Sequence, residues 1–158
     1  MPSEQGSNMA NAETELTVAE AYEIADRFAQ ASARILDFRV NTGNLSGDQA
    51  DALEKAEDQL DAMVVLFRSH GIQLIGAKAE AAAQNIKAAI DAAKSTLVAV
   101  RQIRKVLKVA AALVDLAVAI VSKNVQGVVA AAKTVADASK DDKGGKDGTK
   151  GGKDGNGG

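Results

Sequence analysis

The feature that most constrains this chain is a long stretch without a strong helix breaker. From Ile72 to Ser122 there is no proline and only one internal glycine, Gly76. As a single helix this stretch would be roughly 75 Å long, about twice the length of each of the two helices of about 25 residues predicted before it. The third helix therefore either breaks and folds back or extends beyond the bundle. We expect a bend near residues 94–97, because a serine and a threonine there can satisfy local backbone groups and because an exposed apolar run is unfavourable.

The composition predicts an all-α protein. The 158 residues include 32 alanines, one proline and no cysteine or tryptophan. Alanine has the best intrinsic helix propensity and proline the worst. We predict a bundle of four helices over residues 16–139, a flexible N-terminus over residues 1–15 and a disordered tail over residues 140–158. The tail repeats the sequence KGGKDG, whose glycine, lysine and aspartate residues cannot build a core.

Local signals define the first helices. Thr17 with Glu20, and Ser46 with Gln49, have the spacing of capping boxes. Gly71 suits the left-handed position after the second helix. Because the loops beside the second helix are short, we predict that consecutive helices are antiparallel neighbours. The predicted core positions of the first helix are Val18, Ala21, Ala25, Phe28, Ser32 and Ile35, widened by Tyr22, Ile24, Leu36 and Phe38.

The second half of the long stretch is the most apolar part of the chain. Residues 106–121 are apolar on most faces, and Asn124 is predicted to cap a short fourth helix, so the two segments form an apolar C-terminal hairpin. If the second and third helices turn near Gly71, residues beyond about 95 have no second helix opposite them. The apolar run is roughly 24 Å long and falls short of the about 20 residues that span a bilayer. It is a core helix, an element that inserts into or lies on a membrane, or an interface between copies.

A basic stripe precedes this apolar run. Each lysine or arginine near an anionic lipid surface contributes roughly 1 kcal/mol to binding, so the stripe and the hairpin together predict a membrane or self-association surface. Its candidate residues are Arg101, Arg104, Lys105, Lys108, Leu107, Leu113, Val114, Leu116, Val118, Ile120, Val121, Val125, Val128 and Val129.

The charges divide between the two halves of the chain. Residues 1–70 contain 5 Lys/Arg and 13 Asp/Glu, whereas residues 71–158 contain 14 Lys/Arg and 8 Asp/Glu. The halves therefore pack against each other, or against another copy, with complementary faces, or the basic half meets an anionic partner. An acidic face on the second helix has the same spacing as the basic stripe and is interpreted as an interaction face, a solvated face or a weak cation site. It consists of Glu54, Glu57, Asp58 and Asp61.

Catalytic chemistry finds no support in the sequence. His70 is the only histidine and lies where a helix is predicted to end, a position that favours a cation. The chain has no cysteine nucleophile, no G-x-S-x-G elbow and no phosphate-binding loop. We therefore expect no enzyme activity, cofactor, metal or small-molecule substrate. Nucleic acid is not expected either, since the stripe lacks aromatic residues for stacking and the net charge is −2.

The overall pattern resembles two kinds of helical protein. Long amphipathic helices with one apolar hairpin resemble the architecture of α-helical pore-forming toxins, and alanine-rich helices without cysteine resemble the composition of phasins, which coat polymer granules. Neither resemblance rests on a motif, so neither assigns a residue. Residues 1–15 lack a signal sequence, which predicts a cytoplasmic protein or export without a classical signal peptide.

We expect a non-enzymatic amphitropic protein that holds residues 106–136 inward and can present them to a lipid surface or to another copy. The alternative is a soluble interaction or scaffold protein with the hairpin as ordinary core. Examples of that class are a self-assembling bundle, a secretion accessory or an immunity-type binder.

Overall fold

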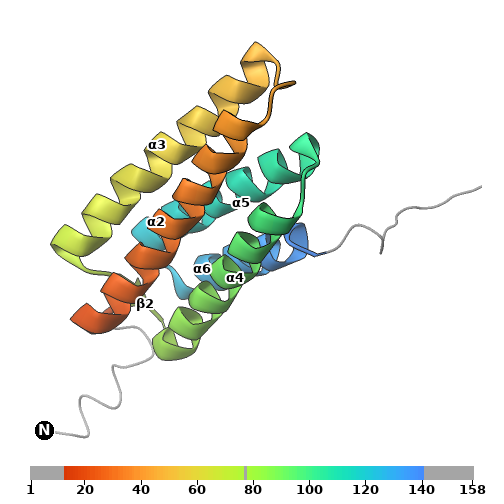
Figure 1. Cartoon of the computed structure of the whole chain (residues 1–158). Coiled ribbons are helices and arrows are strands. Elements are labelled where there is room, and N and C mark those ends of the chain that lie inside the picture. The colour runs from red at the N-terminus through yellow and green to blue at the C-terminus, as the bar shows by residue number, and fades with distance from the viewer. Residues whose placement is uncertain (1–12, 77, 141–158) are drawn as a thin grey trace, which may run out of the picture.

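The computed structural model describes residues 13–76 and 78–140 (Figure 1). The helices are α2 (Val18–Asn41), α3 (Gly47–His70), α4 (Ala79–Ala99), α5 (Ile103–Ser122) and α6 (Val125–Ala138), and the strands are β1 (Glu13–Glu15) and β2 (Gln73–Ile75). The all-α prediction is confirmed, apart from these two short strands, but the described residues form five helices and not four. Most of the predicted flexible N-terminus and all but one residue of the predicted tail lie outside the described residues, whereas β1 shows that residues 13–15 belong to the fold.

The predicted helix starts are correct where a local cap defines them. The Thr17 hydroxyl accepts a hydrogen bond from the Glu20 amide at 3.0 Å, and the Glu20 carboxylate accepts one from the Thr17 amide at 3.3 Å. Ser46 begins α3 with the same reciprocal arrangement. At α6, the side-chain oxygen of Asn124 accepts from the amide of Gly127 at 2.9 Å. Each cap satisfies amides that the helix itself leaves unpaired.

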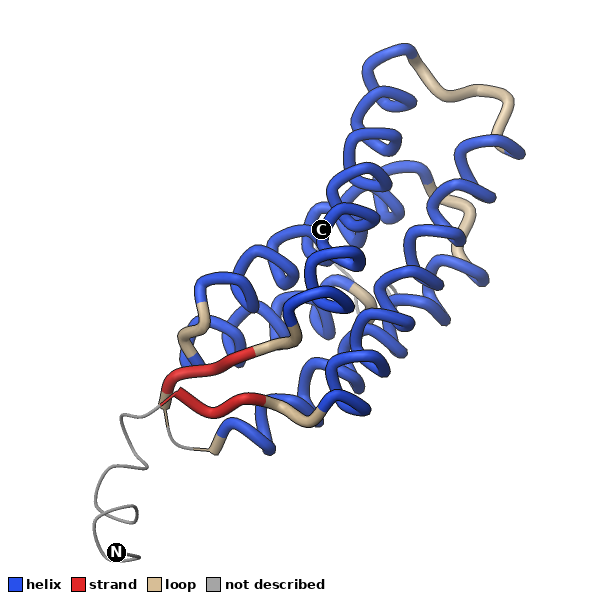
Figure 2. The backbone as a smooth tube through the Cα atoms, turned by 90° about the vertical axis from the view of Figure 1, so that its left-hand side faces the viewer, coloured by secondary structure: helices blue, strands red, loops and turns tan. Residues whose placement is uncertain are grey.

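The third predicted helix does not begin at Ile72. The chain there forms β2, which pairs antiparallel with β1 so that Leu74 lies opposite Thr14 (Figure 2). Ile72 and Leu74 are buried, and the Leu16 amide donates to the Ile72 carbonyl at 2.9 Å. The strand ends at Ile75, and the next residue, Gly76, has a φ of 130°, a conformation that favours glycine. β2 replaces the first turns of the predicted helix, and α4 starts at Ala79.

The long stretch also breaks, as predicted, but a few residues later. α4 ends at Ala99, and Val100 has the extended dihedrals φ −92° and ψ 137°. Thr96, which was expected to help the break, is still helical. Its buried hydroxyl donates instead to the carbonyl of Ser139, at the end of α6, at 2.8 Å. The break therefore falls at residues 100–102, and α5 folds back into the bundle.

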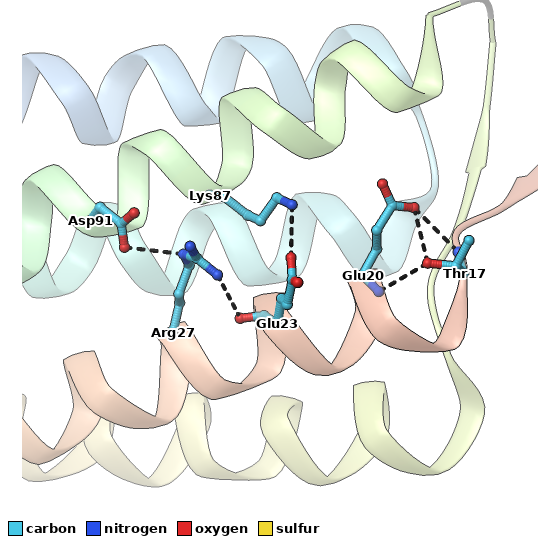
Figure 3. A network of polar contacts seen from close by, with 6 residues as sticks. All are labelled: Thr17, Glu20, Glu23, Arg27, Lys87 and Asp91. Carbon is cyan, nitrogen blue, oxygen red and sulfur yellow. Dashed lines mark hydrogen bonds and ion pairs between the residues drawn. The ribbon is translucent and has the colours of Figure 1, made fainter.

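The topology differs from a simple up-and-down bundle because α2 and α4 run parallel. Polar contacts between them join Glu23 to Lys87 and Arg27 to Asp91 (Figure 3). Gln30 and Lys94 form a third contact about one turn later, and the partners in all three contacts are 64 residues apart. A constant offset requires parallel helices. Because α3 is antiparallel to α2, α3 and α4 do run in opposite directions, as predicted, but they are not packing neighbours: the β2 segment carries the chain past α2, and α4 packs against α2 and α6.

The five helices pack as a closed ring. Going around it, α3 contacts α2, α2 contacts α4, α4 contacts α6, α6 contacts α5, and α5 returns to α3. Large buried side chains from every sector fill the interior, among them Phe28 of α2, Leu60 of α3, Ile86 of α4 and Leu113 of α5. Alanines at the contacts let the helices approach closely and compensate for the small number of large residues.

Candidate functional site

Some residues of the predicted membrane or self-association surface lie in the core, and others are exposed to solvent. Its buried members are Lys105, Leu113, Leu116, Ile120, Val125 and Val128, its half-buried members are Leu107 and Val114, and its exposed members are Arg101, Arg104, Lys108, Val118, Val121 and Val129. The buried apolar residues come from the sides of α5 and α6 that face the interior of the ring. Of the predicted surface, the exposed members are therefore three basic residues and three valines, and the exposed side of α5 also carries Asp115.

None of the helices in the described part of the chain is both long enough and apolar enough to cross a bilayer. This includes α5, whose basic and acidic residues interrupt its apolar sequence.

Lys105 of the basic stripe has a place inside the fold. Its side chain is buried, and its ammonium donates a hydrogen bond to the carbonyl of Lys140, just after α6. A cation is favoured beside the free carbonyls at the end of a helix. The hydroxyl of Thr96 binds the neighbouring Ser139 carbonyl, so Thr96 and Lys105 together link the end of α6 to α4 and α5. An open depression of about 500 Å³ lies at this corner, with Arg101 among its lining residues.

One residue of the predicted acidic face also lies in the core. Glu57 is buried, and its two carboxylate oxygens accept hydrogen bonds from Nε and Nη2 of Arg39 at 2.6 and 2.9 Å. This bidentate contact raises the pKa of Arg39, with further contributions from the nearby carboxylates of Glu54 and Asp58. Glu57 is therefore a structural ion-pair partner that joins α3 to α2, and is not part of an exposed face.

The remaining residues of the predicted acidic face, Glu54, Asp58 and Asp61, are exposed. In the described ranges, no ion pair joins them to the exposed basic residues of α5, so the two stripes that share a spacing do not meet within one copy. Nor does any group of three or more acidic or histidine side chains among the described residues have a geometry that would hold a metal ion.

The sequence analysis missed an exposed apolar stripe on α2. Val18 was assigned to the core, with Tyr22 and Leu36 at its edge, but the structure leaves all three exposed, together with Val40. The core face of α2 is centred instead on Ile24, Phe28, Ala31 and Ile35, about a third of a turn away. A second set of apolar residues with helical spacing was the available signal, and it was read as a wider core face.

No family model, curated protein or solved structure matches this chain.

Proposed function

We propose that this chain is a non-enzymatic helical interaction protein, whose C-terminal hairpin is structural core and whose exposed helix faces bind a protein partner. The observation that carries this proposal is the placement of the apolar residues of α5 and α6. Leu113, Leu116 and Val128 are fully buried, and Ile120 and Val125 nearly so, inside the closed ring of helices.

The energy of this burial argues against the hairpin as a mobile element. Each fully buried aliphatic side chain stabilises the fold by about 1.5–3 kcal/mol, so the five residues together contribute about 7–15 kcal/mol. The free energy of unfolding of a whole domain is about 5–15 kcal/mol. Turning the hairpin outward in water would therefore cost about as much as unfolding the protein.

A second candidate function keeps the core intact. Arg104, Lys108 and Val118 recur along the solvent-facing side of α5, and Arg101 lies just before that helix. At roughly 1 kcal/mol for each basic residue near anionic lipid, the folded protein would adsorb weakly to such a surface through this side. In this form the amphitropic interpretation requires no release of residues 106–136.

Hydrogen exchange with and without anionic vesicles tests the proposal. The full chain is mixed with phosphatidylserine-containing vesicles, floated through a density gradient and analysed for amide exchange in α5 and α6. We expect the chain to stay unbound and the α5 amides to exchange only with global unfolding. Flotation with protected α5 amides, abolished by Arg104→Glu, would favour the surface-adsorption candidate. Flotation with loss of protection in α5 and α6 would contradict the structural role of the hairpin.

A further inference from the structure

An unpartnered apolar stripe runs along the whole of α2. Val18, Tyr22, Leu36 and Val40 have relative exposures of 75%, 46%, 43% and 67%. At about 100° per residue, their positions fall within about 40° of one another around the helix axis. Ala29, which is half-buried, lies on the same line. Single exposed apolar residues are common on protein surfaces, but a line that follows one helix from end to end is the feature of an interaction surface.

Carboxylates flank this stripe. On α2 itself, Asp26 and Asp37 are exposed beside it. On the neighbouring α3, the carboxylates of Glu54 and Asp58 help to raise the pKa of Arg39, which immediately precedes Val40. Near the other end of the stripe, Arg68 of α3 reaches Asp26 at 2.6 Å. Arg39 and Arg68 are already paired with Glu57 and Asp26, whereas Asp37, Glu54 and Asp58 take part in no ion pair among the described residues, so negative charge is in excess beside the stripe.

We propose that this α2 stripe docks an amphipathic α-helix of a partner protein, a helix whose apolar side is flanked by lysine and arginine. The inference rests on the proposed function as an interaction protein and adds the location and the partner class. Tyr22, Ala29 and Leu36 recur every seven residues, the repeat by which one helix packs along another. Apolar residues of the partner meet the stripe, and its cations meet the carboxylates on either side.

Other occupants fit the charges less well. A second copy docked through the same stripe would place carboxylates against carboxylates. The chain's own ends also lack the required chemistry, because residues 141–158 contain no large apolar side chain and residues 1–12 contain no lysine or arginine.

The test uses two synthetic helical peptides of about 24 residues, enough to follow α2 along its length. Both carry leucine at heptad positions a and d, and the flanking positions are lysine in one peptide and glutamate in the other. Binding to the intact chain is measured by fluorescence anisotropy, and analytical ultracentrifugation reports the stoichiometry. We expect one lysine peptide per chain, binding at least roughly 100-fold more tightly than the glutamate peptide and weakening as salt rises.

Substitutions on the stripe distinguish docking from general attraction between opposite charges. Leu36→Gln and Val40→Gln should each weaken binding of the lysine peptide roughly 10-fold, because each removes apolar area that the complex buries. Val98→Gln is the matched control: Val98 is 52% exposed but lies on α4, so we expect a change of less than about 2-fold. Circular dichroism checks that the variants remain folded.

Three results would overturn the docking proposal. They are no binding of the lysine peptide, equal weakening by Val98→Gln and Leu36→Gln, or a dimer of this chain that Leu36→Gln dissociates. The hairpin measurement is independent of all three. A chain whose α5 amides stay protected but which fails to bind the peptide would refute only the docking site, whereas loss of α5 protection would refute the structural role of the hairpin.

Discussion

Two valine-to-alanine substitutions in α5 test directly whether this helix belongs to the cooperative core. Val109 is fully buried, whereas Val118, on the same helix, is 51% exposed. At a buried site, losing two methyl groups costs about 1.6 kcal/mol of transfer free energy. The cavity of roughly 50 Å³ left behind adds about 1 kcal/mol. At both sites the better helix propensity of alanine offsets about 0.5 kcal/mol of this destabilisation.

We therefore expect Val109→Ala to lower the free energy of unfolding by about 2 kcal/mol, and Val118→Ala, which loses half the transfer term and leaves no cavity, by about 0.3 kcal/mol. Because helix propensity affects both variants equally, the difference between them isolates burial.

Urea denaturation followed by circular dichroism measures the effect. With a dependence of about 2 kcal/mol per molar urea, the Val109→Ala midpoint should fall by about 1 M and the Val118→Ala midpoint should stay within about 0.2 M of the parent. Coincident midpoints for the two variants would refute the placement of α5 in the core. A large effect at Val118 alone would show that this side of α5 is covered by something outside the single chain, such as a second copy.

Two further predictions concern the ion pairs. Arg39→Gln leaves the buried Glu57 carboxylate without its cation, so it should lower the urea midpoint clearly more than Arg68→Gln, which breaks an exposed pair; equal shifts would contradict the buried role of Glu57. The hydrogen bond from Lys87 lowers the pKa of Glu23 below its ordinary value of 4.5. This stabilisation is present above about pH 4.5 and is lost as the pH falls through the lowered pKa. Lys87→Met should raise the pKa of Glu23 in a carbon-detected NMR titration, and an unchanged titration would contradict the contact.

The parts of the fold that sequence reasoning predicted are those with local causes. The caps at Thr17, Ser46 and Asn124 each depend on a side chain and an amide three residues away, so the printed sequence contains both partners. The break after α4 was predicted for a different kind of reason, namely that so much apolar surface needs cover. That reasoning gave the existence of the break, whereas its place was predicted from Ser95 and Thr96 and was wrong, because both residues are helical and the Thr96 hydroxyl donates to the Ser139 carbonyl.

The missed features depend on partners far away in the chain. Ile72 and Leu74 look helical until β1, almost sixty residues earlier, is available to pair with their backbone. Because β2 carries the chain to the other side of α2, α3 and α4 are not neighbours, contrary to the prediction. The burial of Glu57 likewise depends on Arg39 of the preceding helix. Neither pairing has a signature within either segment alone.

The topology determines how the acidic first half and the basic second half of the chain face each other in the folded protein. In the described part of the chain, two ion pairs link the acidic first half to the basic second half, and they have opposite polarity: Lys87 with Glu23, and Arg27 with Asp91. Folding therefore neutralises little of the imbalance, and the exposed carboxylates of α3 remain on the helix beside the apolar stripe of α2. A surface that is both apolar and acidic is better complemented by a partner than by water or by its own copy. This is why we expect the cations for the unpaired carboxylates of this face to come from another protein.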